Sequence, residues 1–273
     1  MLQKALLLLP LLAAPLLAQA EIKYKVTDIG VTTAFNFNTG PYLNNRGEIA
    51  GPLGYDPSFG WSSFLYSGGT ASTVGQPGSS AYFAGLNDNG VVAGSLGGKA
   101  TLWQNGMATH IGGAGSAAAG VNNHGVAAGS VRNGGRSNAA IFSNGQMQVL
   151  SATPGYASAI NDSGVVAGTV DVTDEEGGTT RDGFVYQNGV LTTFGAGHGG
   201  EGVFVEDVNE QGTVVGMAGM DGIAGNRIYA YTWSNGQMTD LGALYTSSSG
   251  RSWSSAKAIN SLNQVVGLSL IHI

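Results

Sequence analysis

Short apolar runs separated by turn residues recur along most of the chain. One pattern has an apolar residue, then Asn-x-x-Gly, then two or three apolar residues and a second glycine; it occurs five times and once more as INSLNQVVG from Ile259. Asparagine that opens a turn can hydrogen-bond the backbone ahead of it, and glycine at the fourth position takes positive φ without steric cost. Asn263 replaces that glycine in the last copy, and asparagine tolerates the same conformation. The pattern predicts turns at Asn44, Gly47, Asn87, Gly90, Asn122, Gly125, Asn161, Gly164, Asn209, Gly212 and Asn260.

A second pattern, aromatic-x-Asn-Gly, lies between copies of the first. Asn-Gly between apolar runs favours a two-residue hairpin with a type I′ turn. The hairpin residues are Asn105, Gly106, Asn144, Gly145, Asn188, Gly189, Asn235 and Gly236, and Tyr66–Gly69 is a degenerate first copy. We expect the aromatic residues, Trp103, Phe142, Tyr186 and Trp233, to be packing residues.

The two patterns together predict four strands in each repeat, which is the number in a propeller blade. The fold class is therefore all-β: a β-propeller of four-stranded antiparallel blades, about six of them, with the last incomplete. A two-residue hairpin joins only directly paired strands, so the Asn-Gly turn lies within a blade. Because successive strands alternate in direction, both kinds of turn lie on one face. The variable segments lie on the other face, where we expect function. The stretch 24–29 resembles an outer strand, and we expect it to complete the last blade.

The two ends of the chain differ from the repeats. Residues 1–20 have Lys4, a Leu/Ala run broken by two prolines, and Ala18-Gln19-Ala20, so we interpret them as a signal peptide cleaved after Ala20. A retained anchor is the alternative. Residues 21–267 form the repeat domain. The final LSLIHI, residues 268–273, breaks the repeat and matches the translation of a transposon end used in sequencing libraries. We interpret it as adapter sequence on a truncated chain, the alternative being a genuine C-terminal strand.

Composition narrows the classes of partner. The chain has no cysteine, and its 46 glycines follow no Gly-X-Y period, so disulfide frameworks and collagen are excluded. Removal of residues 1–20 takes away one of the 11 basic residues and none of the 17 acidic ones, which leaves a net charge of −7. This charge argues against nucleic acid and anionic membrane as partners. We expect an exported, extracellular or periplasmic monomer without a membrane span in the mature chain.

The repeats resemble the HAF repeats of bacterial extracellular proteins. The similarity is clearest in Ala157–Asn161, Val165–Gly168 and Trp233–Gly242, and it extends from Tyr24 to Gly267. The resemblance implies export and a propeller-like fold, but no settled activity. The His-Ala-Phe triplet itself is absent, and its place is held for example by Asn138-Ala139-Ala140. No histidine role therefore carries over.

No catalytic signature accompanies the repeats, since the chain lacks H-E-x-x-H, a G-x-S-x-G elbow and a phosphate loop. We expect a non-catalytic binding or cell-surface interaction module. Tyr55, Trp61, Tyr245 and Trp253, aromatic residues in variable segments, are the candidate ligand-binding residues for a carbohydrate or protein partner. Packing of these side chains over the blade core is the alternative. A polysaccharide-active enzyme, a glycosidase or lyase that uses acidic loop residues, is the rival function.

Acidic residues cluster in the loops of the fourth and fifth repeats. Asp171, Asp174, Glu175 and Glu201 form a weak candidate site for calcium, which prefers six to eight oxygen ligands. They lack the spacing of a dedicated calcium loop, so ordinary solvated acidic loops are the favoured alternative. No other cofactor is expected.

If these carboxylates hold calcium, the ion should raise the melting temperature of the mature domain because it relieves their repulsion. The double substitution Asp174→Asn with Glu175→Gln should abolish the rise. The measurement is thermal unfolding with calcium and with chelator. Identical melting curves in the two conditions would leave only surface charge.

Overall fold

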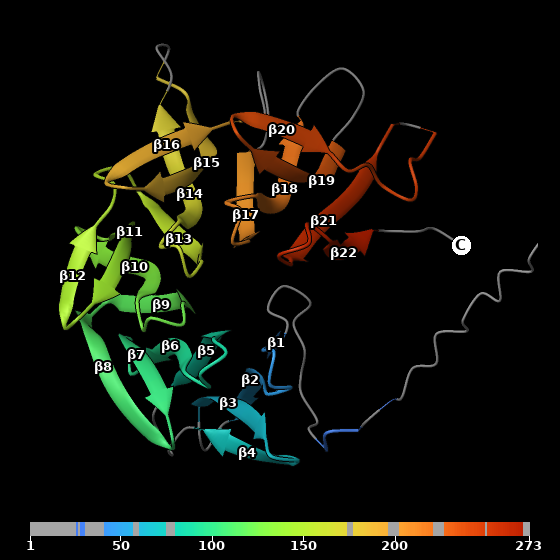
Figure 1. Ribbon diagram of the computed structural model, residues 1–273. Coiled ribbons are helices and arrows are strands. Elements are labelled where there is room, and N and C mark those ends of the chain that lie inside the picture. The colour runs from blue at the N-terminus through green and yellow to red at the C-terminus, as the bar shows by residue number, and fades with distance from the viewer. Residues whose placement is uncertain are drawn as a thin grey trace, which may run out of the picture.

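The chain folds into a ring of antiparallel sheets around a central axis (Figure 1). The computed structural model describes residues 26, 28–30, 41–56, 60–74, 80–173, 177–195, 202–220, 227–248 and 250–269. These ranges contain strands and turns but no helix. Five complete four-stranded blades are followed by two strands of a sixth, so the predicted β-propeller is confirmed.

Each blade follows the chain from the ring axis outward. Blade 1 consists of β1 (Tyr42–Leu43), β2 (Ile49–Asp56), β3 (Gly60–Ser67) and β4 (Thr70–Val74). Blade 2 consists of β5 (Ala81–Leu86), β6 (Val92–Leu96), β7 (Lys99–Gln104) and β8 (Met107–Ala114). Blade 3 consists of β9 (Ser116–Val121), β10 (Ala127–Asn133), β11 (Arg136–Ser143) and β12 (Gln146–Val149).

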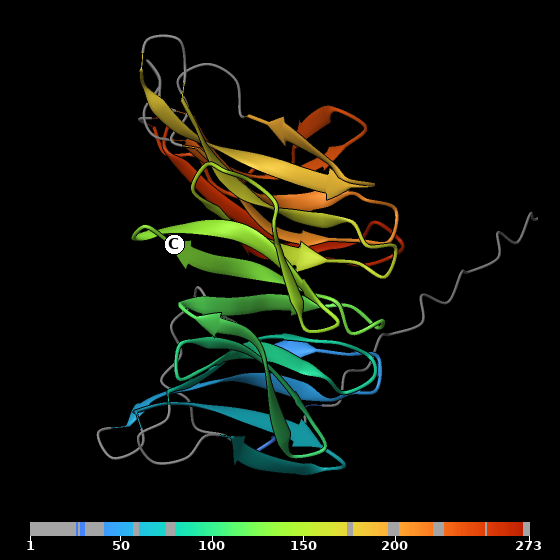
Figure 2. The same ribbon diagram turned by 90° about the vertical axis from the view of Figure 1, so that its left-hand side faces the viewer.

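The remaining blades continue in the same order. Blade 4 consists of β13 (Gly155–Ile160), β14 (Val166–Thr173), β15 (Thr179–Gln187) and β16 (Val190–Phe194). Blade 5 consists of β17 (Gly202–Val208), β18 (Val214–Met220), β19 (Arg227–Ser234) and β20 (Gln237–Asp240). The two strands of blade 6 are β21 (Ser252–Ile259) and β22 (Val265–Ser269). Seen from the side, the strands run across the ring between its two faces (Figure 2).

Both predicted turns form where the sequence placed them. Every Asn-x-x-Gly turn joins the first and second strands of a blade, and Asn263 has the expected positive φ of 58°. Every aromatic-x-Asn-Gly turn joins the third and fourth strands. In these hairpins both central residues have positive φ, for example 52° at Asn105 and 78° at Gly106, which defines a type I′ turn. The two kinds of turn therefore share one face of the ring, which we call the turn face.

The opposite face is less variable than the sequence suggested. In blades 2 and 3 the second and third strands are joined by Gly97-Gly98 and Gly134-Gly135, again with positive φ at both residues. The prediction of variable loops was wrong there, because Gly-Gly closes a two-residue hairpin as well as Asn-Gly does. Longer second-to-third connections remain at 57–59, 174–178 and 221–226.

The second glycine of each Asn-x-x-Gly pattern, which lies on the second strand of the blade, is required for steric reasons. In blades 2 to 6 the innermost strand carries a β-bulge opposite this glycine, as at Ala157/Ala159 opposite Gly168. A Cβ on Gly168 would lie 2.2 Å from the carbonyl oxygen of Tyr156, and one on Gly216 would lie 1.9 Å from that of Phe204. Only glycine permits so close an approach of two backbones.

The leading asparagines of the turns form a ladder that links all six blades. The Nδ2 group of each donates to the backbone carbonyl oxygen of the next, over 2.8–3.1 Å. The ladder runs through Asn44, Asn87, Asn122, Asn161, Asn209 and Asn260. Within its own turn each Oδ1 accepts the amide of the residue four places on. The first five asparagines are at most 8% exposed.

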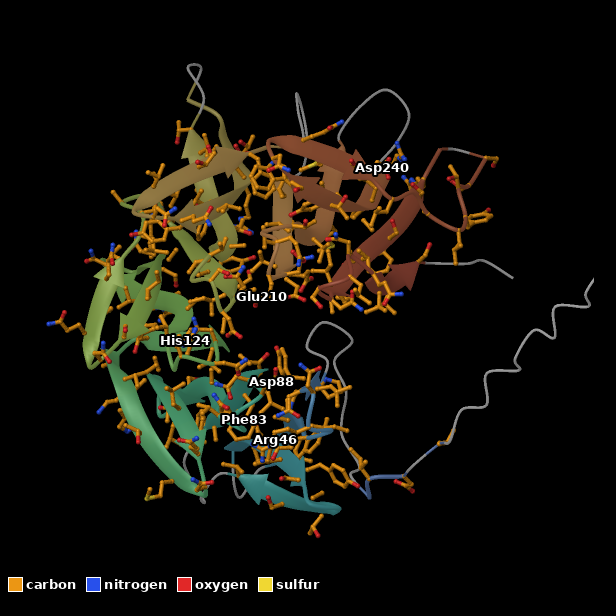
Figure 3. The ribbon with its side chains drawn as sticks, viewed as in Figure 1. Arg46, Phe83, Asp88, His124, Glu210 and Asp240 are labelled. Atoms are coloured by element: carbon orange, nitrogen blue, oxygen red, sulfur yellow. The ribbon has the colours of Figure 1, made fainter. Side chains whose placement is uncertain are left out.

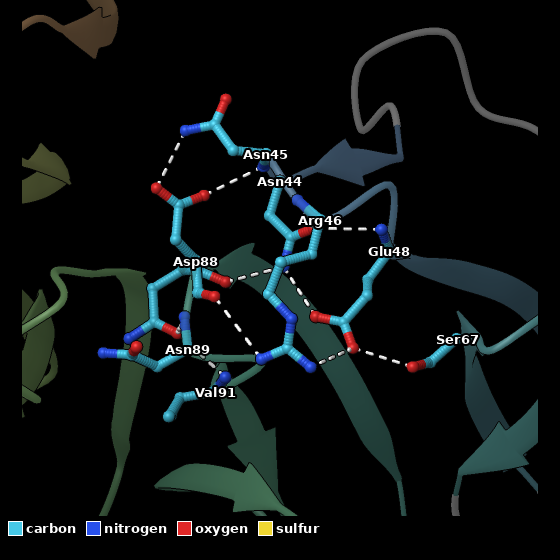
Figure 4. Close-up of polar contacts among 9 residues, drawn as sticks. Asn44, Asn45, Arg46, Glu48, Ser67, Asp88, Asn89 and Val91 are labelled. Atoms are coloured by element: carbon cyan, nitrogen blue, oxygen red, sulfur yellow. Dashed lines mark hydrogen bonds and ion pairs between the residues drawn. The ribbon is translucent and has the colours of Figure 1, made fainter.

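A second row of polar contacts runs beside the ladder on the turn face (Figure 4). The carboxylate of Asp88 accepts the backbone N–H and the side-chain amide of Asn45, and these bonds lower the pKa of Asp88. Buried Glu48 accepts hydrogen bonds from Ser67 and Asn44 and pairs with Arg46 at 3.2 Å. The Ser67 bond is the largest cause of the lowered pKa of Glu48. The buried carboxylate of Glu48 is thus satisfied by its neighbours rather than left without partners.

The apolar core lies between neighbouring blades rather than at one centre. One cluster packs Val165 and Phe194 of blade 4 against Val203 and Tyr231 of blade 5. Another packs Phe83 and Trp103 of blade 2 against blade 1. Alanine and valine dominate the inner strands because the blades converge there and leave little room for larger side chains. Larger rings fill the wider space further from the axis.

Blade 6 departs from the regular pattern. Its inner strand β21 pairs with β19 in parallel, at Arg227↔Ser252 and Ile228↔Trp253, so the last two blades share one sheet. Strand β22 extends to Ser269, and Val266 on it is 64% exposed. The outer strand expected over 24–29 is not formed at its described residues, Val26 and 28–29, and Val26 is 93% exposed.

The ladder predicts a graded response to truncation of its asparagines. Asn87→Ala should lower the free energy of unfolding by about 2–4 kcal/mol, because the amide of Val91 and the carbonyl of Asn122 lose their buried partner. Asn260→Ala is the matched control: its exposed side chain bonds only within its own turn, and it should cost less than about 1 kcal/mol. Urea denaturation measures both, and equal costs would contradict a role for the links between blades.

Candidate functional site

Two pockets open between blades on the turn face. One lies between blades 1 and 2, with a volume of about 560 Å³, and the other lies between blades 4 and 5, with about 410 Å³. Both volumes fall in the range of small-molecule sites. Each pocket is bounded by the outer strands of one blade and by the two tight turns of the next.

The two pockets are built from the same positions of the repeat. The wall residues correspond in pairs, with the residue of the pocket between blades 1 and 2 given first: Leu65 and Val185, Ser72 and Thr192, Gly90 and Gly212, Trp103 and Trp233, and Asn105 and Asn235. The strand register confirms the match, since Leu65 pairs with Ser72 as Val185 pairs with Thr192. One structural plan therefore produces both pockets.

A tryptophan forms the inner wall of each pocket. Trp233 stacks against Phe194 at a centroid distance of 4.5 Å, and Trp103 meets Phe83 edge-on at 4.7 Å. These contacts hold both indoles in place. Trp103 is only 6% exposed and Trp233 is partly buried. Among the described residues neither indole N–H has a hydrogen-bond acceptor in the protein.

Side chains lie across the equivalent spaces between the other complete blades. Between blades 3 and 4, Gln148 occupies the position of Ser72 and its Nε2 group donates to the hydroxyl oxygen of Tyr186 at 2.9 Å. Between blades 2 and 3, Phe142 is 1% exposed, and a Cβ on Gly112 would lie 2.9 Å from its ring. The open spaces are thus the two that have tryptophan on the third strand and a small hydroxyl residue opposite.

The pockets carry almost no charge. Among the described residues, no ionisable side chain lines the pocket between blades 1 and 2, and its polar groups include Ser72, Gln104 and Asn105. The pocket between blades 4 and 5 has one, Glu210. The carboxylate of Glu210 accepts the Asp162 backbone N–H at 2.9 Å, so it is already engaged in linking two turns. Both sites suit a neutral ligand.

The sequence patterns predicted that the two tryptophans pack in the core, but they did not predict a binding site there. They do pack in the core, as expected, and they also line the pockets. A signal was available: among the four aromatic-x-Asn-Gly copies, only these two have tryptophan. Recognising the pocket also requires the residue across the gap, which belongs to the preceding blade. Sequence spacing alone does not pair the two.

The aromatic candidates of the variable segments are only partly described. Tyr55 and Trp61 are backbone partners in the β2–β3 ladder, and their side chains lie outside the described residues. Trp253 is a partly buried residue of β21, and Tyr245 is a partly buried residue before it. Blades 1 and 6, which carry these residues, lie on either side of the gap in the ring (Figure 1). Their role in binding stays a prediction.

The calcium candidates are likewise mostly outside the described residues. Asp174, Glu175 and Glu201 are among the residues left undescribed. Asp171 lies on β14 opposite Arg181, and Nε of Arg181 is 3.5 Å from Oδ1 of Asp171. The described part of the chain has no group of three or more histidine, aspartate or glutamate side chains that could hold a metal ion. Calcium binding stays a prediction.

The described ionisable groups have structural contacts. Nδ1 of His110 is 2.9 Å from the hydroxyl oxygen of Thr101, and His124 lies in a turn near the ring axis (Figure 3). Burial raises the pKa of the Asp207 carboxyl from 3.8 to about 6. Its oxygens accept the backbone amides of Val208 and of Ile259 in the next blade, so it joins blades 5 and 6. Neighbouring Glu206 pairs with Lys257 at 2.5 Å.

Comparison with known proteins supports the fold. No protein-family model matches the chain, and no curated protein matches it. The β-propeller domain of the Trilobed protease from Pyrococcus furiosus, described as having an open velcro topology, is similar in structure with a TM-score of 0.52. It is 12% identical, and the match covers 85% of this chain and 75% of that one. Pyrococcus horikoshii acylaminoacyl peptidase matches with a TM-score of 0.41 and 11% identity, over 85% of this chain and 48% of that one.

The raised pKa of Asp207 predicts a dependence of stability on pH. Between its ordinary value of 3.8 and about 6, the folded state binds the proton more tightly than the unfolded state, so this group's contribution to stability falls as the pH rises through that window. The loss is at most about 3 kcal/mol. Asp207→Asn should remove this pH-dependent loss. In urea denaturation, the free energy of unfolding of the variant should therefore rise relative to that of the natural chain between pH 4.5 and 7. Parallel pH profiles would contradict the assignment.

Proposed function

We propose that this chain is a non-catalytic binding module exported from the cell, which uses the two pockets on its turn face to hold a ligand. The observation that carries the proposal is that one pocket is built twice, from matching residues of different repeats. A single gap between blades can result from imperfect packing and need not bind a ligand. Two gaps with the same wall residues are better explained by a shared role.

The chemistry of the walls also favours binding over catalysis. The described lining of the pocket between blades 1 and 2 has no ionisable side chain, and a general acid or base needs one within reach of the substrate. Glu210 in the other pocket is engaged by the Asp162 amide. Indole, hydroxyl and amide groups are those of recognition sites, where apolar contact is combined with a few placed polar groups.

Export and location follow from the sequence alone and are part of the proposal. The leader over residues 1–20 and the likeness to HAF repeats support secretion to the periplasm or the cell exterior. The described residues include no helix with the length and apolarity that a membrane crossing demands. A module with free pockets on one face is suited to attachment at a cell surface, with carbohydrate or protein as the partner.

The rival function, a polysaccharide-active enzyme, requires two carboxyl groups placed on either side of a scissile bond. Of the four acidic residues named as candidates, Asp171, which pairs with Arg181, is the one that lies among the described residues. The similar propeller domain belongs to a protease, but a likeness at 12% identity concerns the fold and carries no activity to this chain.

Binding and catalysis are separated by one experiment. The mature chain is incubated with a panel of insoluble polysaccharides and with washed bacterial cell envelopes, and both the sedimented protein and the released reducing ends are measured. We expect co-sedimentation with at least one material and no release above the level of a heat-denatured sample. Release of reducing ends that grows with time would favour the enzyme, and failure to sediment with any material would contradict the proposed binding function.

A further inference from the structure

We infer that the two tryptophan-walled pockets are saccharide subsites, each sized for a short stretch of neutral sugar. This inference rests on the proposed binding function and names its ligand. It follows from three properties of the pockets: the absence of usable charge, the combination of indole with hydroxyl and amide groups, and the repetition of the same site on one face of the ring.

Charge excludes the other common classes of small ligand. A phosphate or carboxylate ligand needs Arg, Lys or a row of free amides, and no basic side chain is among the described residues that line either pocket. A cationic ligand needs carboxylates or an aromatic cage, whereas the sole carboxylate, Glu210, is engaged by a neighbouring turn. A neutral ligand is the class that these walls leave.

The walls match the surface of a sugar ring. A pyranose has C–H faces that pack on apolar and aromatic side chains, and a rim of hydroxyl groups that donate and accept hydrogen bonds. The pocket between blades 1 and 2 offers Leu65 and Trp103 for the faces, and Ser72, Gln104 and Asn105 for the rim. Equivalent groups in the second pocket are Val185, Trp233, Thr192, Ser234 and Asn235.

An extended peptide is a poorer fit. Peptides that add to a sheet need a free strand edge with unpaired backbone groups. The named walls are instead side chains that project from the paired residues Leu65 and Ser72, together with the tight turn after Trp103. We therefore treat a peptide as an outcome of the test rather than as the ligand.

The arrangement of the two pockets favours a polymer. They lie three blades apart, and both open on the turn face. Blades 1 and 2 lie across the ring axis from blades 4 and 5 (Figure 1). A long chain laid across that face can occupy both, so that the second contact forms at high effective concentration. Affinity should then rise from short oligosaccharides to polysaccharides of the same sugar by more than the number of sugar units explains.

The test fills each pocket with a glutamine side chain, as Gln148 fills the equivalent space between blades 3 and 4. Ser72→Gln and Thr192→Gln place the same long side chain at the two pockets. Both positions are exposed, so folding should be unaffected. Thr109→Gln is the matched control, because it lies at the same repeat position beside a space that is already closed.

Binding is measured by isothermal titration with cellotriose, mannotriose and triacetylchitotriose, with a trigalacturonate and an unstructured neutral peptide as counter-probes. We expect two equivalent sites for at least one neutral oligosaccharide, one site in each single variant, a loss of affinity of about tenfold or more in the double variant, and no change in Thr109→Gln. Binding that survives closure of both pockets overturns the assignment of the sites.

The remaining outcomes separate this inference from the proposed function. If the peptide or the trigalacturonate binds and the double variant abolishes that binding, the pockets are binding sites but the sugar assignment is wrong. If no probe binds while the chain still sediments with envelopes, the binding function stands and the saccharide inference fails. If the chain neither sediments nor binds a probe, both fail together.

Discussion

The buried amide of the leading asparagine is the interaction on which the ring depends. In Asn87, for example, Oδ1 accepts two backbone amides of its own turn, and Nδ2 donates to the carbonyl oxygen of Asn122 in the next blade. One neutral side chain therefore shapes a turn and fixes the distance to the neighbouring blade. A buried amide without its partner is costly, so each position has few acceptable substitutes.

The pockets follow from this constraint. Because the ladder holds the blades together at the turn ends of their inner strands, the sheets diverge toward the outside, and the gap between them must be filled by side chains. Gln148 with Tyr186 fills one gap, and Phe142 under β8 fills another. Where tryptophan stands opposite a small hydroxyl residue, the gap stays open and becomes the candidate binding site.

The sequence was sufficient to predict the features that depend on local chemistry. The Asn-x-x-Gly turns, the type I′ hairpins and the positive φ of Asn263 follow from the conformational preferences of single residues, and the structure confirms them. The ladder was not predicted, because the partner of Asn44 is 43 residues away and no local rule identifies its carbonyl oxygen. The pockets were missed for the same reason: Trp233 and Thr192 become neighbours only once the blades are placed side by side. The parallel pairing of β19 with β21 also depends on tertiary contact alone.

Native-state hydrogen exchange tests most directly whether the ladder binds the blades into one unit. The amides of Val91, Val126, Val165 and Thr213 each donate to a ladder asparagine, whereas that of Gln264 donates to Asn260 at the exposed end. If the ladder couples the blades, the first four should exchange with one common free energy, equal to that of global unfolding, and Gln264 should exchange faster. Four separate opening free energies, each well below the global value, would show that the blades open independently and would contradict the account.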